Sequence, residues 1–194
     1  HWAEGYIKYC YSQGVISGKG DGTFAPDENV TAVQAAKMLL VAIGYNAKVQ
    51  GYVGSDWQIN IIRDAQTSKF FDELSVNANK VLTRDEAAQM IYNAVQAKMI
   101  EKTPVLNVTT GTLQYEYRAS LTKTLLSETF EALTFIGTLK GNDKTVTACN
   151  KGEVQVYGKL DTENTGDRNA QFPSDITLSN IGEEVKVNIK DGKG

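Results

Sequence analysis

The chain has 194 residues, of which 41% are hydrophobic and 22% charged, and its formal net charge is −3. This length suggests one or two domains, since a domain typically has roughly 100–150 residues. The balanced charge offers no basic face for nucleic acid, and no apolar run of about 20 residues predicts a membrane span.

Residues suited to catalysis or metal binding are scarce. His1 is the only histidine, and Cys10 and Cys149 are the only cysteines. A Ser-His or Cys-His arrangement and a zinc ligand set are therefore excluded. Neighbouring acids such as Asp85-Glu86 do not make a glycosidase pair, because that pair must face across a sugar cleft. We expect no enzyme active site, no metal and no cofactor, and we expect Cys10 to be a small core residue.

The chain opens with a predicted helix–loop–helix unit. Trp2, Tyr6, Ile7 and Cys10 recur at helical spacing, and Gly14 is placed to end that helix. The loop GKGDGTFAPDEN at 18–29 is rich in turn-forming residues; its single aspartate, Asp21, favours a plain turn over a calcium site. A second helix is predicted to begin after Thr31, which with Gln34 has the spacing of a capping box.

The same plan recurs further along the chain. Thr83 lies 52 residues after Thr31, and Trp57 lies 55 residues after Trp2. The segment LTRDEAAQMIYNAV at 82–95 again begins a predicted helix with a capping box, formed by Thr83 and Glu86. A period in the low fifties indicates a repeated supersecondary unit that packs on its neighbours to bury its apolar face.

These residues resemble the S-layer homology family. The family pattern is a Trp-Ala start, a Gly-rich GxGDGxF loop and a Thr-Arg-x-Glu helix start, all found across HWAEGYIKYCYSQGVISGKGDGTF and LTRDEAAQ. The resemblance implies a helical bundle that attaches a protein to an acidic polysaccharide linked to peptidoglycan. It also implies that the arginine of Thr-Arg-x-Glu, which is Arg84 here, contacts the anion. The candidate carbohydrate-binding residues are Arg84, Glu86, Trp57, Trp2 and Thr31.

The two copies depart from the pattern in different ways. Ala32 and Gln34 replace the arginine and glutamate in the first copy, whereas the second copy keeps Arg84 but lacks the GxGDGxF loop. Arg84 could equally be a solvated residue of the first helical turn. The two tryptophans could stack on sugars, although their positions on apolar stripes favour core packing.

Composition changes after Lys102-Thr103-Pro104 towards threonine, valine and glycine. Alternating side chains predict strands at 113–117, 144–148, 153–158 and 184–189. Residues 122–133 place Leu125, Phe130 and Leu133 on one helical face, which predicts a short helix, and 161–175 is polar enough for a long loop. We expect a small β-rich domain here, either a sandwich or a partly open, OB-like barrel.

The predicted fold class is therefore α+β and multidomain. The expected domains are a first S-layer homology module at 1–48 lacking its extreme N-terminus, a diverged second module at 49–103, and a β-rich domain at 104–194. The start at His1 suggests a piece of a longer protein. We expect an extracellular, non-catalytic surface-layer protein whose partners are the wall polysaccharide or peptidoglycan and neighbouring modules or surface-layer subunits. The alternative is the anchor or spacer of a larger surface enzyme or adhesin.

Overall fold

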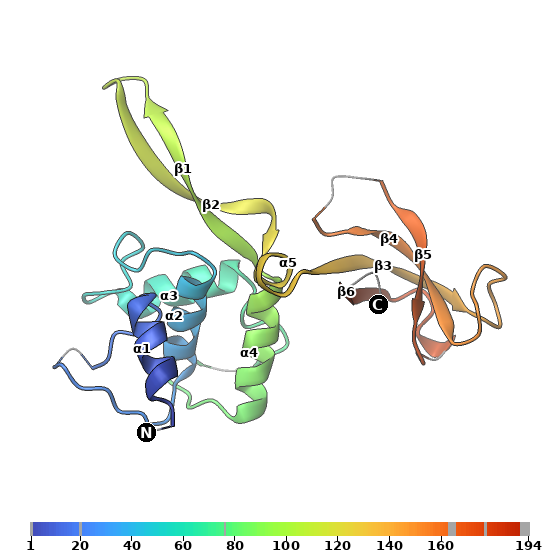
Figure 1. Cartoon of the computed structure of the whole chain (residues 1–194), viewed down its shortest axis with the longest axis horizontal. Helices are drawn as coiled ribbons and strands as arrows, with labels where there is room; N and C mark the ends of the chain where they lie inside the picture. Colours follow the sequence, from blue (N-terminus) through green and yellow to red (C-terminus); the bar gives the residue numbers. More distant parts are fainter. Residues whose placement is uncertain (1, 20, 76, 163–165, 177, 191–194) are drawn as a thin grey trace. The chain divides into compact units, whose positions relative to one another are not determined.

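The computed structural model describes residues 2–19, 21–75, 77–162, 166–176 and 178–190. It contains both helices and strands, so its class is α+β (Figure 1). The chain divides into two compact units, His1–Ser120 and Leu121–Gly194. No described helix is long and apolar enough to cross a membrane.

The first unit contains the four predicted helices, at α1 (Glu4–Ser12), α2 (Ala32–Ala42), α3 (Trp57–Thr67) and α4 (Arg84–Gln96). Helix α2 packs against both α3 and α4. Leu40, Ile61 and Met90, one from each of these helices, are fully buried. The helical spacing of apolar residues in α2, α3 and α4 thus produces a shared core.

Helix α1 does not contribute to this core. No residue of α1 is buried, Cys10 is only partly covered, and Trp2, just before the helix, is 83% exposed. The prediction that Trp2 and Cys10 pack in a core is therefore wrong for the described residues. The physical reason is that periodicity identifies an apolar face of a helix but not a neighbour that covers it.

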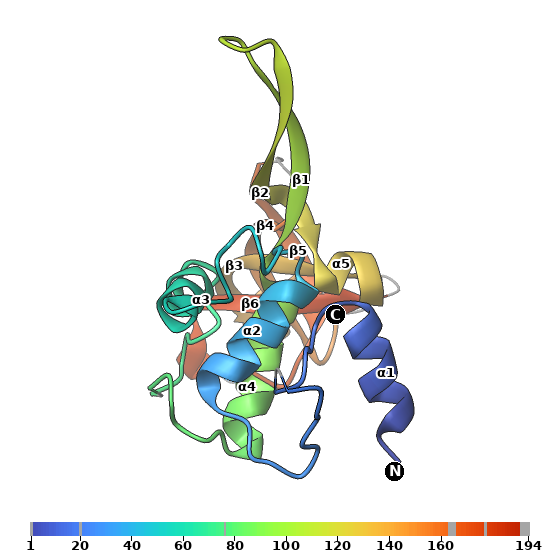
Figure 2. The same cartoon turned by 90° about the vertical axis from the view of Figure 1, so that its left-hand side faces the viewer.

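A β-hairpin follows α4 and extends away from the helices (Figures 1 and 2). It consists of β1 (Lys98–Asn107) and β2 (Thr112–Thr124), which form a two-stranded sheet. The strand predicted at 113–117 is confirmed within β2, while β1 was not predicted. The composition change at 103/104 falls inside β1, and the two compact units divide later, between Ser120 and Leu121.

The second unit is a four-stranded antiparallel sheet in the order β5-β4-β3-β6. Its strands are β3 (Ala132–Asn142), β4 (Glu153–Leu160), β5 (Arg168–Pro173) and β6 (Glu184–Lys190). Its core contains Phe135, Leu139, Val156 and Phe172. Among the described residues this sheet is open, with β5 and β6 at its edges, so the expected sandwich or barrel is not observed. Strands β4 and β6 confirm the predictions at 153–158 and 184–189.

Glycines allow two of these strands to approach closely. Gly137 of β3 pairs directly with Gly158 of β4. A Cβ on Gly158 would lie 2.0 Å from the carbonyl oxygen of Ile136 and 2.5 Å from the Cα of Gly137. No other residue fits at this crossing without displacing the backbone of the neighbouring strand.

Three predictions for this unit need correction. Residues 144–148 form turns instead of a strand, because the Asn142 carbonyl accepts the amides of Thr145 and Val146. The helix expected over 122–133 is limited to α5 (Leu125–Phe130), which begins after the cap residue Thr124. The loop expected over 161–175 contains β5, whose polar residues pair with β4 through the backbone.

Candidate functional site

The start of α4 carries the candidate anion-binding residue. Thr83 precedes the helix, and its hydroxyl accepts the Glu86 amide at 3.2 Å. The Glu86 carboxylate accepts the Thr83 amide at 2.9 Å and the Thr83 hydroxyl at 3.1 Å. These reciprocal bonds satisfy two backbone donors and hold the first helical turn in place, so the position of Arg84 within that turn is well defined.

The acidic side chain of this turn is already engaged. Glu86 forms an ion pair with Lys80 in addition to its bonds with Thr83, and its side chain is 17% exposed. The Lys80 ammonium, followed by the Thr83 amide, lowers the pKa of Glu86 below its usual value. Glu86 thus remains ionised and acts as a helix cap, with both carboxylate oxygens occupied by protein donors.

Arg84, by contrast, has its charge available. It is the first residue of α4, it is exposed, and no hydrogen bond or ion pair engages its guanidinium within the described ranges. A helix N-terminus carries partial positive charge from its unpaired amides, which adds to the charge of an arginine located there. A guanidinium can give two parallel hydrogen bonds to a carboxylate. The adjacent Asp85, also exposed, opposes this attraction.

The start of α2 differs from that of α4. The predicted capping box of Thr31 and Gln34 is present, and the Gln34 side chain accepts the Thr31 amide at 2.9 Å. In addition, the amides of Ala32 and Val33 donate to the carbonyls of Lys80 and Ala78, each at 2.9 Å.

Thr31 also pairs with Val81 in an isolated antiparallel bridge. The segment that leads into α4 therefore covers the N-terminus of α2, and Ala32 is fully buried beneath it. Ala32 occupies the position equivalent to Arg84. An arginine cannot fit at this buried position, which explains physically why the first copy lacks one.

The structure places the tryptophans differently from each other. Trp2 is largely exposed, as described above, while Trp57 begins α3 and is partly buried. Thr31, just before α2, pairs with Val81 in the segment that leads into α4. Among the described residues, no hydrogen bond or ring contact given by the structure joins Trp2 to Arg84.

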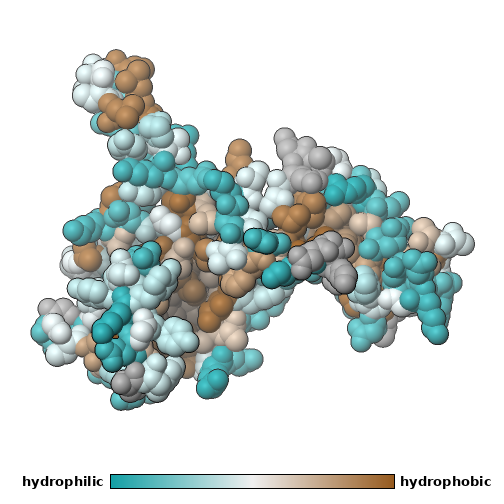
Figure 3. Space-filling view, in the orientation of Figure 1, coloured by the Kyte–Doolittle hydropathy of each residue, from teal (hydrophilic) through white to brown (hydrophobic). Residues whose placement is uncertain are grey.

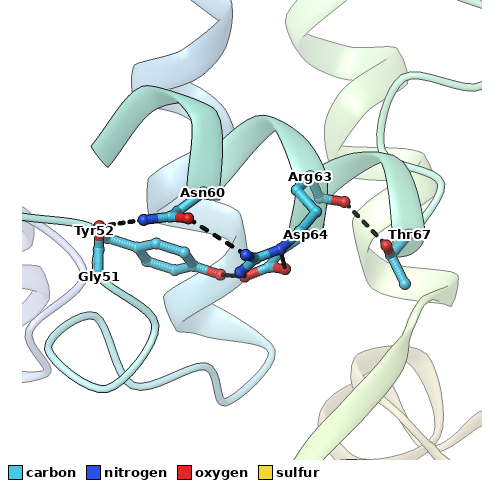
Figure 4. Close-up of polar contacts among 6 residues, drawn as sticks. All are labelled: Gly51, Tyr52, Asn60, Arg63, Asp64 and Thr67. Atoms are coloured by element: carbon cyan, nitrogen blue, oxygen red, sulfur yellow. Dashed lines mark hydrogen bonds and ion pairs between the residues drawn. The ribbon is translucent and has the colours of Figure 1, made fainter. Parts of the chain in front are cut away.

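A buried polar network lies on α3, and no sequence pattern predicted it. The Tyr52 hydroxyl donates to Asp64 at 2.7 Å, and the Arg63 Nε donates to the same carboxylate at 2.8 Å (Figure 4). Asn60 donates to the Gly51 carbonyl at 3.1 Å and so holds the preceding loop on the helix. Burial, followed by the hydrogen bond to Asp64, raises the pKa of Tyr52 far above its usual value. The network fixes the loop between α2 and α3.

The described residues contain no group of three or more metal-ligating side chains. Asp21, the residue considered for calcium, accepts the amide of Thr23 at 2.9 Å and its hydroxyl at 2.6 Å. These bonds lower the pKa of Asp21, with the Thr23 hydroxyl the larger cause, and they make the carboxylate part of a turn. The arrangement at α4 supports the binding of an anion by one arginine.

Comparison with known proteins agrees with the helical repeat. Residues 1–39 match the family described as S-layer homology domain. The chain is 28% identical over 101 residues to a cell surface protein of Thermoanaerobacter kivui, which covers 52% of this chain and 12% of that protein. It is 42% identical over 52 residues to S-layer protein EA1 of Bacillus anthracis, covering 25% of this chain and 6% of that one.

An endoglucanase of Bacillus sp. strain KSM-635 is 33% identical over 103 residues, which is 49% of this chain and 11% of the enzyme. The chain thus spans about a tenth or less of the length of these relatives. No solved structure is significantly similar to it. Residues 1–39 are thus similar to an S-layer homology domain.

Proposed function

We propose that the helical unit attaches a bacterial surface protein to an acidic polysaccharide of the cell wall, and that Arg84 contacts an anionic group of that polymer. The family match at residues 1–39 and the relatives named as surface and S-layer proteins support attachment. They also support an extracellular location at the wall. Within this proposal the chain itself binds and does not catalyse.

The exposed, unpaired Arg84 at the first turn of α4 is the observation that carries the proposal. Glu86, two residues on, is bound by Lys80 and Thr83, so it does not neutralise the guanidinium. The start of α2 is closed by the backbone of residues 78–81 and presents the buried Ala32 instead. Among the described residues, we therefore propose the start of α4 as the anion site.

Four further residues complete the proposal. Glu86 and Thr31 act on the site through the helix starts, by capping α4 and by joining α2 to the segment before α4. Trp57 and Trp2 are the aromatic candidates for sugar contacts. Of these, Trp2 has the larger exposed surface, and an aromatic face of this kind stacks on the apolar face of a sugar ring.

Cosedimentation with isolated cell walls tests the proposal. Walls of a Gram-positive bacterium with an acidic secondary polysaccharide would be used before and after hydrofluoric acid removes that polymer. We expect the chain to sediment only with intact walls, Arg84→Ala to lose most binding, and Arg84→Lys to retain a part of it. Lys48→Ala, which removes an equal charge from an exposed turn, is the matched control. Equal retention of wild type and Arg84→Ala would overturn the role of Arg84.

A second candidate is an anchor or spacer within a larger surface enzyme. The similarity to an endoglucanase over 103 residues favours it. The same wall-binding result is expected in this case, since the anchor would work in the same way. The two are distinguished by sequencing the gene around this chain: a flanking region with a paired-carboxylate hydrolase domain supports the enzyme, and flanking repeats of surface-layer type contradict it.

A further inference from the structure

Strand β2 presents an apolar row to solvent. Side chains alternate along a strand, so Leu113, Tyr115, Tyr117, Ala119 and Leu121 share one face. Leu113 is 60% exposed and Leu121 is 90% exposed. Figure 3 shows apolar atoms gathered at the tip of the hairpin, where Leu106, Val108 and Leu113 are exposed. A row of large apolar side chains in water is an unfavourable arrangement for an isolated hairpin.

The edge of this strand is also unprotected. In the part of the chain that the structure describes, the sheet contains only β1 and β2, so no strand lies along the outer edge of β2. Proteins usually protect such an edge with charges, because it can pair with another chain. Within residues 113–121 of β2, only Glu116 and Arg118 are charged. The hairpin therefore has the properties of a strand that pairs with another strand.

The charges that β2 does carry indicate which strand it pairs with. Glu116 and Arg118 lie on the opposite face from the apolar row and form an ion pair within the chain, with Arg118 Nε 2.7 Å from the Glu116 carboxylate. If two copies of β2 run antiparallel about a two-fold axis at Tyr117, Glu116 of each copy lies opposite Arg118 of the other. The strand is thus electrostatically complementary to itself.

The neighbouring registers are disfavoured by the same residues. Moving the axis to residue 116 or 118 places Glu116 opposite Glu116, or Arg118 opposite Arg118, and like charges in that position are destabilising. A shift of the pairing by one residue turns the apolar row of one copy towards the polar row of the other. With the axis at Tyr117, Leu113 of one copy lies opposite Leu121 of the other, so the two most exposed leucines of the strand cover each other.

We propose that β2 is a self-association surface, on which two copies of this chain pair antiparallel through residues 113–121 with the axis at Tyr117. The two hairpins then form one four-stranded sheet, and the apolar rows of the two copies become continuous. This inference goes beyond wall binding and does not depend on Arg84.

Analytical ultracentrifugation of the full 194-residue chain tests the pairing. The wild type is expected to form dimers. E116R gives each copy two cationic side chains at the pairing centre and R118E gives two anionic ones, so each variant alone should dimerise about tenfold or more weakly. An equimolar mixture of E116R and R118E should dimerise again, because the opposite charges then lie across the interface. Loss of the ion pair within each chain cannot explain this recovery.

A matched control and a cross-link make the result specific. K48E changes the net charge by the same amount as R118E at an exposed turn, and it should leave dimerisation unchanged. In a background with both native cysteines changed to serine, Y117C should form a disulfide-linked dimer with diamide, since residue 117 lies opposite its own copy. Q114C should not, because the two copies of that residue lie far apart in this register.

Three results would overturn the proposal. They are a wild-type chain that stays monomeric up to millimolar concentration, single charge reversals that dimerise as tightly as the wild type, and a mixture that fails to recover association. Far-UV circular dichroism confirms that each variant is folded before its association is measured. The substituted residues 116 and 118 are exposed, so folding is expected to be retained.

Discussion

The hydrogen bond between Tyr52 and Asp64 is expected to be a main support of the helical unit, and Tyr52→Phe tests this. The substitution removes one hydroxyl from a side chain that is 1% exposed and leaves the ring in place. The Asp64 carboxylate, itself 8% exposed, then loses its shortest bond, of 2.7 Å.

The expected cost follows from the partners that remain. A hydrogen bond to a charged group is worth roughly 1.5–3 kcal/mol, and a buried acceptor left without its donor adds a desolvation penalty. Arg63 still donates to both oxygens of Asp64, at 2.8 and 3.1 Å, so the carboxylate is not left unpaired. We therefore expect Tyr52→Phe to lower the free energy of unfolding by about 1.5–2 kcal/mol, in the lower half of that range.

Urea unfolding monitored by circular dichroism measures this change. Tyr45→Phe is the matched control, since the Tyr45 ring lies 6.2 Å from the Tyr52 ring but its hydroxyl has no hydrogen bond among the described residues. Its cost should stay below about 0.5 kcal/mol, as for ordinary substitutions away from such features. A double-mutant cycle with Asp64→Ala should give a coupling energy above about 1 kcal/mol. If Tyr52→Phe and Tyr45→Phe cost the same, the argument from the buried hydroxyl is refuted.

Four further predictions concern Tyr52, Glu86, Ala32 and Gly158. The raised pKa of Tyr52 stabilises the fold fully below pH 10, the pKa of an unfolded tyrosine, so the stability advantage of wild type over Tyr52→Phe should shrink by about 1 kcal/mol between pH 10 and 11 in urea titrations. The lowered pKa of Glu86 stabilises the folded state above pH 4.5, so the wild type should lose more stability than Glu86→Gln as the pH falls below that value. Equal losses would contradict the capping role. Ala32→Arg should cost about 3 kcal/mol or more by thermal unfolding because it buries a charge, and an equally stable variant would refute the closed α2 start. Gly158→Ala should lower the melting temperature of the second unit and leave the first unchanged, since its Cβ meets the backbone of β3.

The sequence predicted the helices well because each carries its own periodic apolar face. Helices α2, α3 and α4 have the expected positions, and their residues Leu40, Ile61 and Met90 are fully buried. Helix α1 has the same periodicity and yet no buried residue. Periodicity describes one helix, whereas burial depends on a second surface that the sequence pattern does not specify.

The strands were predicted less completely, because pairing depends on residues far apart in sequence. Residues 144–148 alternate like a strand, but Asn142 forms local bonds that favour a turn. Strand β5 has a polar sequence and is held by its backbone pairing with β4. Composition placed the domain boundary at 103/104 because threonine and valine increase there, although these residues belong to the hairpin of the first unit.

The candidate site also combines local features, which the sequence predicts, with long-range contacts, which it does not. The Thr-Arg-x-Glu pattern alone identified Arg84 as a residue of the first helical turn, because capping is local. The pairing of Thr31 with Val81 could not be foreseen, since it joins segments about 50 residues apart. The Tyr52–Asp64 bond depends in the same way on a loop conformation that no sequence pattern encodes.

A heteronuclear NMR titration tests the central claim most directly. The chain, labelled with ¹⁵N, would be titrated with acidic polysaccharide released from purified walls, and the amides and arginine Nε signals would be followed. We predict saturable shifts concentrated in the amides of residues 83–86 and in the Arg84 Nε, with no shift at Ala32 beyond that of distant residues. Shifts at the start of α2 and none at Arg84, or no saturable shifts at all, would contradict a polysaccharide site at α4.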